Sequence, residues 1–267
     1  MARLKVAALG SSFAAGPAID PIVNAGAQRS GRNYPNQLAQ KLDADLTDLT
    51  VSGATMLNVL NEAQTTRSGE TFPPQLNHLP AQTDIVTLTG GGNDMGYSSG
   101  MIYDSAMAYK GPLEGMLDGL IEAPATSMAG QQLTDRFIAV IDKVKEIAPK
   151  ARIYLVEYIA VFGPATQPNV GTTLDKEAIE QYRERARVLS KAYQDVATAR
   201  PGVECIAVAK DSEAHCVGSA EPWITGFAMD MFLEGLVPYH PNLAGHTAVA
   251  EMVYRRIQAA KDASSQL

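Results

Sequence analysis

Three short apolar segments of this chain each run directly into a turn of small residues. The segments are residues 4–9, 46–51 and 84–89, and the turns that follow them are residues 10–16, 52–55 and 90–94. Apolar, β-branched segments of this length predict buried strands, and glycine and serine at their ends predict tight turns. Because neighbouring parallel strands open at their carboxyl ends onto one crevice, we expect the three turns to lie close together.

The rest of the chain continues the alternation of strands and helices. Helical spacing of apolar residues predicts helices around residues 38–46, 56–60, 133–147 and 179–193 and after Pro241, and residues 153–158 and 203–207 predict two more strands. Residues 17–34 and 64–82 predict loops, and the methionine-rich residues 95–128 predict short helices and loops. This alternation favours an α/β fold with a parallel sheet between two layers of helices. The length of 267 residues and the even composition favour a single domain over residues 1–267.

Charge and hydropathy restrict the partners of this chain. The formal net charge is −7, the isoelectric point is near 5.1, and the basic residues form no block, which argues against nucleic-acid binding. No apolar run approaches the roughly 18 residues that a transmembrane helix needs. We therefore expect no nucleic-acid partner and no transmembrane segment, and the sequence indicates no particular oligomeric state.

The cysteines and the glycine-rich turns bear on metals and cofactors. Cys205 and Cys216 are the only cysteines, and neither their spacing nor their neighbours suggest zinc. They are compatible with one disulfide that closes a surface loop or with two inert thiols. Because the chain has no Walker phosphate loop and no complete dinucleotide fingerprint, we expect neither a metal nor a cofactor.

The first residues have a second interpretation, as a secretory signal. Arg3 and Lys5 precede a short apolar run, and small residues follow it. The run from Val6 to Leu9 is too short for a signal core, and cleavage after Ala15 would remove the first strand and its turn. The chain as written is therefore expected to be cytoplasmic, and the mature form of a secreted protein is the alternative.

Ser12 lies in the first of the three turns, where an open α/β sheet places its chemistry, and we predict that it is a nucleophile. A serine nucleophile needs a base, and the chain offers four histidines. His78 and His215 lie in loops and are predicted to face solvent, and His246 on the last helix is predicted to be structural. His240 directly precedes a proline at the entry to that helix, where its ring can reach the crevice. His240 is therefore the candidate base.

Four short motifs follow one another along the chain. They are GSSFAAG at residues 10–16, Gly53, GND at residues 92–94 and HPN at residues 240–242. In this order they resemble the four blocks of the SGNH, or GDSL-type, hydrolases over nearly the whole chain. Residues 239–246, with Cys216 and Pro222-Trp223 upstream, are more similar to the actinobacterial lipase and esterase branch than to the small thioesterases. The resemblance implies a three-layer α/β/α sandwich, the flavodoxin-like SGNH fold, with a five-stranded parallel sheet in the order 2-1-3-4-5.

The resemblance also implies a role for each matching residue. Ser12 would attack an ester carbonyl while His240 accepts its proton and later returns it to the leaving alcohol. The main-chain N–H groups of Ser12 and Gly53 and the side-chain amide of Asn93 would form the oxyanion hole. Glycine suits its position because it has no Cβ to block the approach of the substrate.

The chain departs from the family pattern at two positions. Ser11 stands where the family usually has Asp before the nucleophile, and Val237 stands where the triad acid is expected, three residues before His240. Three explanations compete for the second departure. The main-chain carbonyl of Val237 could accept the Nδ1–H of His240, which we favour; the carboxylate of Asp230 or Glu234 could replace the acid; or the enzyme could be weakened or inactive.

The sequence therefore predicts a serine hydrolase of the EC 3.1.1 type that cleaves small-molecule carboxylic esters, an esterase or lipase. The alternatives are a carbohydrate O-acetyl esterase and a non-catalytic binding descendant of the family. We expect some of the apolar residues that flank the predicted site to line an acyl pocket for short-to-medium chains, and packing in the core is an equally simple explanation for at least half of them. The flanking residues are Met95, Met101, Met107, Trp223, Phe227, Met229, Met231, Phe232 and Leu236.

Overall fold

A five-stranded parallel sheet forms the centre of the computed structural model, which describes residues 3–264 except 112–114, 116–122 and 124–127. Its strands are β1 (Leu4–Gly10), β4 (Ala44–Asp48), β7 (Ile85–Thr89), β8 (Arg152–Val156) and β9 (Val203–Ile206). They lie in the order β4-β1-β7-β8-β9, which is the order 2-1-3-4-5 of the sheet strands along the chain. The predicted fold class and strand order are confirmed.

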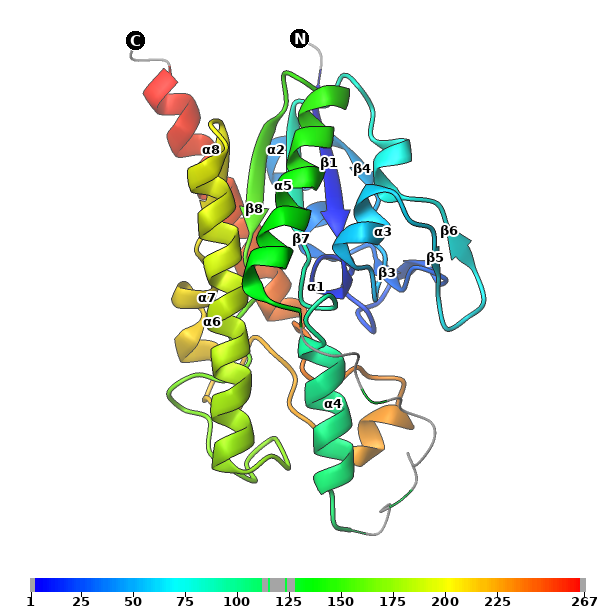
Figure 1. Ribbon diagram of the computed structural model, residues 1–267, viewed down its shortest axis with the longest axis vertical. Helices are drawn as coiled ribbons and strands as arrows, with labels where there is room; N and C mark the ends of the chain where they lie inside the picture. The colour runs from blue at the N-terminus through cyan, green and yellow to red at the C-terminus, as the bar shows by residue number, and fades with distance from the viewer. Residues whose placement is uncertain (1–2, 112–114, 116–122, 124–127, 265–267) are drawn as a thin grey trace.

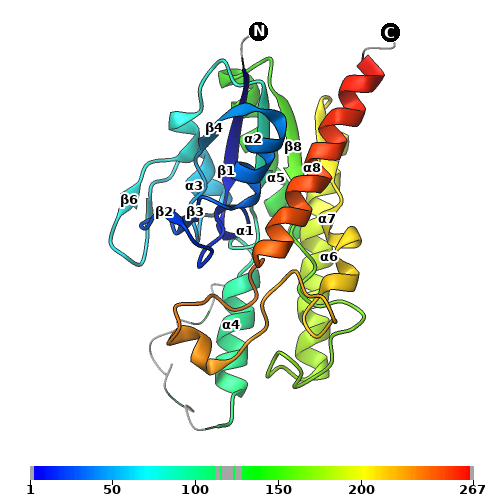
Figure 2. The same cartoon turned by 180° about the vertical axis from the view of Figure 1, so that it is seen from behind.

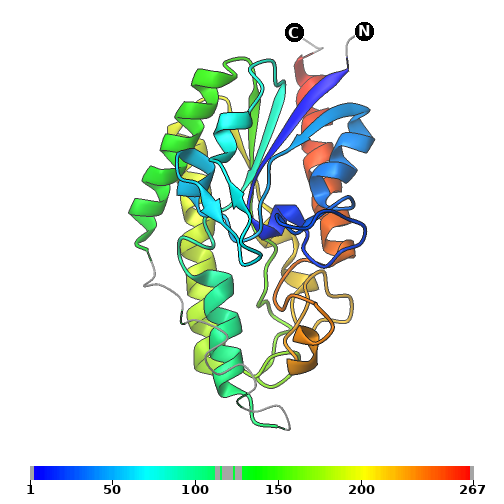
Figure 3. The ribbon, with the colours of Figure 1, turned by 90° about the vertical axis from the view of Figure 1, so that its right-hand side faces the viewer.

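Helices cover both faces of this sheet. On one face lie α3 (Met56–Leu60), α5 (Gly130–Ile147) and α6 (Lys176–Ala199), and on the other lie α2 (Tyr34–Leu42) and α8 (Leu243–Ser264). The side view in Figure 3 shows the sheet between these two layers. Strand β7 is buried along its whole length because both of its faces are covered, which explains its unbroken apolar and β-branched sequence.

The second sheet strand begins earlier than predicted. Helix α2 ends at Leu42 because Asp43 takes a left-handed conformation (φ 48°), so Leu46 belongs to the strand and pairs with Val6 of β1. Strand β4 itself spans residues 44–48 in place of the predicted 46–51. The N–H groups of Leu49 and Val51 still bond to β1, which carries the chain to the turn at Gly53.

The predicted loops contain short elements. They are the hairpin β2 (Ile22–Asn24) with β3 (Arg29–Ser30), the hairpin β5 (Gln64–Thr65) with β6 (Thr71–Phe72), and the 3₁₀ helix η1 (Gln75–His78). Within the methionine-rich segment, α4 (Tyr97–Ala108) is one continuous helix, and parts of residues 109–128 lie outside the described residues. The remaining short helices are α1 (Ser12–Ala15), α7 (Val208–Asp211), η2 (Glu213–His215) and η3 (Met229–Phe232).

The carboxyl edge of the sheet collects the elements that matter for function. Helix α1 follows β1, the Gly53 turn follows β4, and the turn before α4 follows β7. The segments after β8 and β9 occupy the other half of the same edge. No helix in the described part of the chain is long and apolar enough to cross a membrane.

Candidate active site

Ser12 and His240 meet at the carboxyl end of β1, although 228 positions separate them in the chain. Ser12 is the first residue of α1, and its Oγ lies 2.8 Å from Nε2 of His240. The other ring nitrogen of His240, Nδ1, lies 2.8 Å from the carbonyl oxygen of Pro238. Since a carbonyl can only accept, Nδ1 carries the proton in the neutral ring and Nε2 is free to accept the Ser12 hydroxyl proton.

The end of β1 is held so that Ser12 has a defined position. Gly10 has φ 131°, and a Cβ on it would lie 2.0 Å from the carbonyl oxygen of Thr89, so only glycine fits there. The side chain of Gln75 bonds to both the N–H and the C=O of Gly10, at 2.8 and 2.9 Å. Ser11 Oγ lies 2.8 Å from the hydroxyl of Tyr158. Gln75 and Tyr158 were missed from the sequence because their contacts with this turn span 65 and 147 positions.

The expected contact between Val237 and His240 is absent, and Pro238 takes its place. The carbonyl of Val237 accepts a hydrogen bond from Thr225 Oγ1 at 2.9 Å. Tyr239 has φ 57°, a conformation that is rare for a bulky residue. The turn at Tyr239 directs the carbonyl of Pro238 toward the His240 ring, and Pro238 lies two residues before the histidine, where three were predicted. The idea of a main-chain carbonyl acceptor fits this geometry, but the predicted residue was wrong by one position.

No carboxylate within the described part of the chain bonds to His240. The two candidates, Asp230 and Glu234, are exposed, and they lie on and just after the short helix η3, while His240 is buried. Since the ring nitrogens of His240 are already held by Pro238 and Ser12, neither candidate is needed to complete its hydrogen bonds.

The loop that presents His240 is fixed by two residues that the sequence analysis did not identify. The hydroxyl of the buried Tyr239 lies 2.6 Å from both Ser105 Oγ and Thr172 Oγ1. Thr225 Oγ1 bonds to the carbonyls of Val237 and His240 and accepts the N–H of His240 at 3.1 Å. Backbone strain at a site persists where surrounding contacts over-determine it, and these hydrogen bonds supply such contacts at Tyr239.

Gly53 and Asn93 border the same cavity as Ser12 and His240. Gly53 has φ 84°, and the side-chain amide of Asn93 donates to the carbonyl of Ala54 at 2.9 Å, which leaves its second N–H unused by that contact. Asp94 ties the two turns together because its carboxylate accepts from the N–H of Met56 at 2.9 Å. The structure therefore brings together all four residues that the motifs indicated.

The cavity around these residues has a volume of about 670 Å³ and two chemically different ends. One end is apolar and contains Ile102, Phe232, Leu236 and Val237. The other is polar and contains Gln28, Asn58 and residues 64–68. A cleft of this kind suits a ligand with one apolar and one polar part.

Only two of the nine predicted acyl-pocket residues line this cavity, Phe232 and Leu236. The buried core contains Met95, Met101, Phe227 and Met229, and Met107, Trp223 and Met231 are not cavity-lining residues either. This agrees with the expectation that only some of the nine line a pocket. The sequence could not indicate which ones, because flanking position along the chain does not determine on which side of a helix or loop a side chain lies. Ile102 of α4 was missed for the same reason.

Burial sets the charge of the histidines near the site. Burial lowers the pKa of His240 to about 4, and the hydrogen bond to the Pro238 carbonyl opposes this shift. The ring is therefore neutral near pH 7 and able to accept a proton. His246 is also buried, which lowers its pKa to about 3; its Nδ1 accepts the Tyr34 N–H at 3.0 Å, and its Nε2 has no partner among the described residues. His78 is exposed and His215 is half-buried against Trp223.

The cysteines are free thiols. Cys205 is half-buried and Cys216 is buried, and Cys216 Sγ lies 3.4 Å from the hydroxyl of Thr166. Burial raises the pKa of Cys205 to about 12, and Glu157 beside it acts in the same direction. Within the residues that the structure describes, no group of three or more His, Cys, Asp or Glu side chains could hold a metal ion.

Solved structures with the same fold include two Streptomyces enzymes. A crystal structure of an extracellular lipase from Streptomyces rimosus superposes with a TM-score of 0.70 at 20% identity and covers 93% of this chain and 98% of that chain. A phospholipase A1 from Streptomyces albidoflavus superposes with a TM-score of 0.69 at 19% identity, covering 96% and 99%. At this identity the likeness establishes the fold.

Sequence comparison establishes the family. "Lipase 2" of Streptomyces coelicolor is 30% identical to this chain in an alignment that covers 93% of the chain and 84% of that relative. Residues 8–248 match the GDSL-like lipase/acylhydrolase family. This match includes the turns that hold Ser12, Gly53 and Asn93 and the loop that holds His240. The chain therefore belongs to the GDSL-like lipase/acylhydrolase family.

Proposed function

We propose that this protein is a serine hydrolase of carboxylic esters, with Ser12 as nucleophile and His240 as general base. The observation that supports this most directly is the 2.8 Å contact between Ser12 Oγ and His240 Nε2 at the wall of a cavity large enough for an ester. A nucleophile within hydrogen-bond reach of a base that a third group orients is the geometric signature of this chemistry.

In the acylation step, Ser12 Oγ attacks the ester carbonyl carbon while its proton passes to His240 Nε2. The new bond joins Oγ to the carbonyl carbon, the carbonyl oxygen becomes an oxyanion, and the imidazolium keeps its second proton on Nδ1 toward Pro238. The bond from the carbonyl carbon to the alkoxy oxygen then breaks, and His240 gives its proton to the leaving alcohol. Water repeats the sequence on the acyl-serine and releases the carboxylic acid.

The oxyanion is stabilised by donors that need no rearrangement. Ser12 opens α1, and the first N–H groups of a helix have no intrahelical acceptor. Gly53 N–H and the second N–H of Asn93 complete the set, because both residues border the cavity beside Ser12. Each donor of this kind contributes about 2.7 to 4 kcal/mol to transition-state stabilisation.

The substrate proposed is an ester with a short-to-medium acyl chain. The apolar end of the cavity, with Ile102, Phe232 and Leu236, would take the acyl chain, and the polar end around Gln64 and Arg67 would take the alcohol. The polar end is also the observation that favours the second candidate, an acetylated carbohydrate, whose small acyl group would leave most contacts to hydroxyl groups.

Labelling with an organophosphonate and a series of p-nitrophenyl esters test these points. We expect one phosphonate adduct, located on Ser12 by mass spectrometry and abolished in His240→Ala. An unlabelled Ser12 in the folded protein would refute the hydrolase and leave the non-catalytic binding protein. In the ester series we expect kcat/KM to peak between butyrate and octanoate, and activity confined to acetate would instead favour the carbohydrate O-acetyl esterase.

A further inference from the structure

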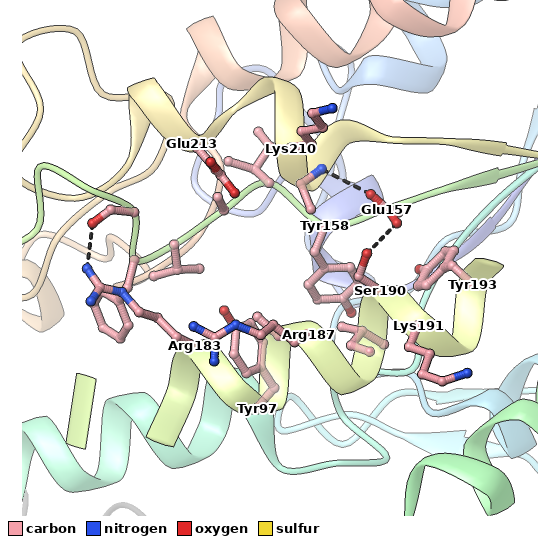
Figure 4. A pocket seen from close by; sticks show the side chains of 18 of the residues that line it. Tyr97, Glu157, Tyr158, Arg183, Arg187, Ser190, Lys191, Tyr193, Lys210 and Glu213 are labelled. Carbon is pink, nitrogen blue, oxygen red and sulfur yellow. Dashed lines mark hydrogen bonds between the residues drawn. The ribbon is translucent and has the colours of Figure 1, made fainter. Parts of the chain in front are cut away.

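A second cavity, of about 620 Å³, lies at the carboxyl edge of β8 and β9. Helix α6 borders it on one side, and α7 with the segment after β8 borders it on the other (Figure 4). Its lining includes neither the Ser12–His240 pair nor Gly53 or Asn93, so it is separate from the candidate active site. The carboxyl edge of an open α/β sheet is where ligands bind, which makes this cavity a candidate binding site.

The floor of the second cavity is apolar and contains one hydroxyl that bonds to no described residue. Tyr158, Val161, Phe162 and Leu189 provide buried aromatic and aliphatic surface. Tyr97 lines the same floor, is only 2% exposed, and its hydroxyl has no hydrogen-bond partner anywhere in the described chain. Because this hydroxyl keeps some accessible surface, it is able to bond to a polar group of a ligand in the cavity.

The charged groups around the cavity favour a ligand that accepts hydrogen bonds. Arg183 and Arg187 project from successive turns of α6, on the same side of the cavity as Tyr97 (Figure 4). Both arginines pair with Glu180, which is exposed, and ion pairs of exposed side chains contribute at most about 1 kcal/mol, so a ligand carboxylate could replace it. Arg183 also donates to the carbonyl of Gly163 at 2.6 Å, which holds its guanidinium at the cavity (Figure 4). Arg187 also pairs with the exposed Glu184.

The buried acid of the cavity does not need a ligand. The Glu157 carboxylate accepts the Ser190 hydroxyl and the N–H of Ala209, and it lies on the side of the cavity away from Arg183 (Figure 4). The remaining charges, Glu213, Lys191 and Lys210, are on exposed residues. At the Tyr97 end the cavity therefore offers one hydroxyl without a partner among the described residues and two guanidinium groups paired with exposed carboxylates, and an anionic acceptor on an apolar body is the complement of this lining.

We propose that the second cavity binds an amphipathic carboxylic acid, with its carboxylate on Tyr97, Arg183 and Arg187 and its chain over the apolar floor. The volume lies within the range of about 300 to 1,000 Å³ that is usual for small-molecule sites. Binding here requires no turnover at Ser12, so the inference is independent of the proposed function.

Binding of sodium decanoate, measured by isothermal titration calorimetry, tests the proposal. Tyr97→Phe removes only the hydroxyl and should weaken binding about tenfold, because a hydrogen bond to a charged group is lost. The double variant Arg183→Gln and Arg187→Gln should weaken it further, and Ala186→Phe should abolish it by filling the cavity. Arg255→Gln, at an exposed ion pair on α8, is the matched control and should bind as the unmodified protein does.

Two further titrations test which cavity binds decanoate and whether the negative charge of the ligand matters. Leu236→Asp alters the rim of the active-site cavity and should leave decanoate binding unchanged. Loss of binding in Leu236→Asp with retention in Tyr97→Phe would overturn the proposal, because the acid would then occupy the active site. Absence of decanoate binding, or equal binding of decylammonium, would overturn it as well. Thermal melting of each variant separates lost binding from lost folding, and the outcome of the phosphonate labelling affects none of these readouts.

Discussion

The two cavities at the carboxyl edge of the sheet have similar volumes, about 670 and 620 Å³. Each is lined by a serine with a side-chain partner, Ser12 in the first and Ser190 in the second, and the two partners differ. Ser12 bonds to the neutral imidazole of His240, which can accept its proton. Ser190 bonds to Glu157, a carboxylate that also accepts a main-chain N–H. Tyr158 separates the two regions: it lines the second cavity, bonds to Ser11 and stacks on Phe13 with ring centroids 4.0 Å apart.

This difference supports the proposal that Ser12, and not Ser190, is the nucleophile. Beside Ser12, the imidazole of His240 is held on its far side by the Pro238 carbonyl, and Gly53 and Asn93, the proposed oxyanion donors, border the same cavity. At Ser190 the acceptor carries its charge before any reaction, and charge-assisted hydrogen bonds hold both groups in place. The first arrangement is poised for proton transfer and the second for binding.

Alanine substitution of each serine gives the largest expected contrast. Ser12→Ala should lower kcat by at least about 10⁴-fold, because nucleophile and base act as a unit. Ser190→Ala should leave kcat within about twofold. The rates are measured on the best p-nitrophenyl ester, and equal losses in the two variants would remove the distinction between the cavities.

Loss of the Asn93 amide should have the next largest effect. Asn93→Ala should lower kcat about 10²- to 10³-fold, with KM little changed, since this donor acts mainly on the oxyanion. Gln194→Ala, a side-chain amide on the second cavity, is the control and should leave both constants near their original values. A rise in KM alone for Asn93→Ala would assign that amide to substrate binding.

Removal of the Thr225 hydroxyl tests how His240, the proposed base, is positioned. Thr225→Val deletes the hydrogen bonds to Val237 and His240 while keeping the side-chain shape, and we expect kcat to fall about tenfold at unchanged KM. Thr225→Ser restores the hydroxyl and should recover most of the rate. If serine fails to rescue while melting temperatures stay equal, the methyl group and not the hydrogen bonds would be responsible.

The dependence of kcat/KM on pH should show a smaller effect that is specific to a buried histidine. Because His240 must be neutral to act as base and burial lowers its pKa to about 4, kcat/KM at pH 5 should keep about nine-tenths of its plateau value. An ordinary histidine, with a pKa of about 6.5, would lose most of its activity at that pH.

The same pKa shifts determine how stability depends on pH. Since the folded pKa values of His240 and His246 lie below about 6.5, the unfolded chain binds more protons, and the free energy of unfolding should fall as pH drops below about 6.5. Urea denaturation at each pH measures this fall and defines the range in which rates are meaningful. A stability that is constant from pH 7 to pH 5 would contradict the low pKa values.

The smallest effects are expected from the two carboxylates near the histidine loop. Asp230→Asn and Glu234→Gln should each keep kcat within about twofold, because both side chains are exposed and neither bonds to His240. Unchanged rates would support the difference between the two cavities: a carbonyl bonds to His240 in the first, and the carboxylate of Glu157 bonds to Ser190 in the second. A loss of several orders of magnitude in either variant would show that a mobile carboxylate orients the ring during turnover.

The sequence by itself determined the fold class and the residues that meet at the carboxyl edge, and its resemblance to the SGNH hydrolases implied the strand order. Small-residue turns after three predicted strands placed Ser12, Gly53 and Asn93 together, because parallel strands end on one side of a sheet. His240 was predicted to reach the same crevice because it lies directly before the last helix. These are consequences of local pattern and topology, which the order of residues encodes directly.

Only the tertiary structure decided how the base is held and what lines each cavity. The choice of Pro238 over Val237 depends on the left-handed turn at Tyr239, which is held by contacts with Ser105 and Thr172. Those contacts span 134 and 67 positions of the chain, so no local pattern announces them. The second cavity, with Tyr97 in its lining, likewise forms only once α4, α6 and the segment after β8 are packed together, because a cavity is a property of neighbours in space.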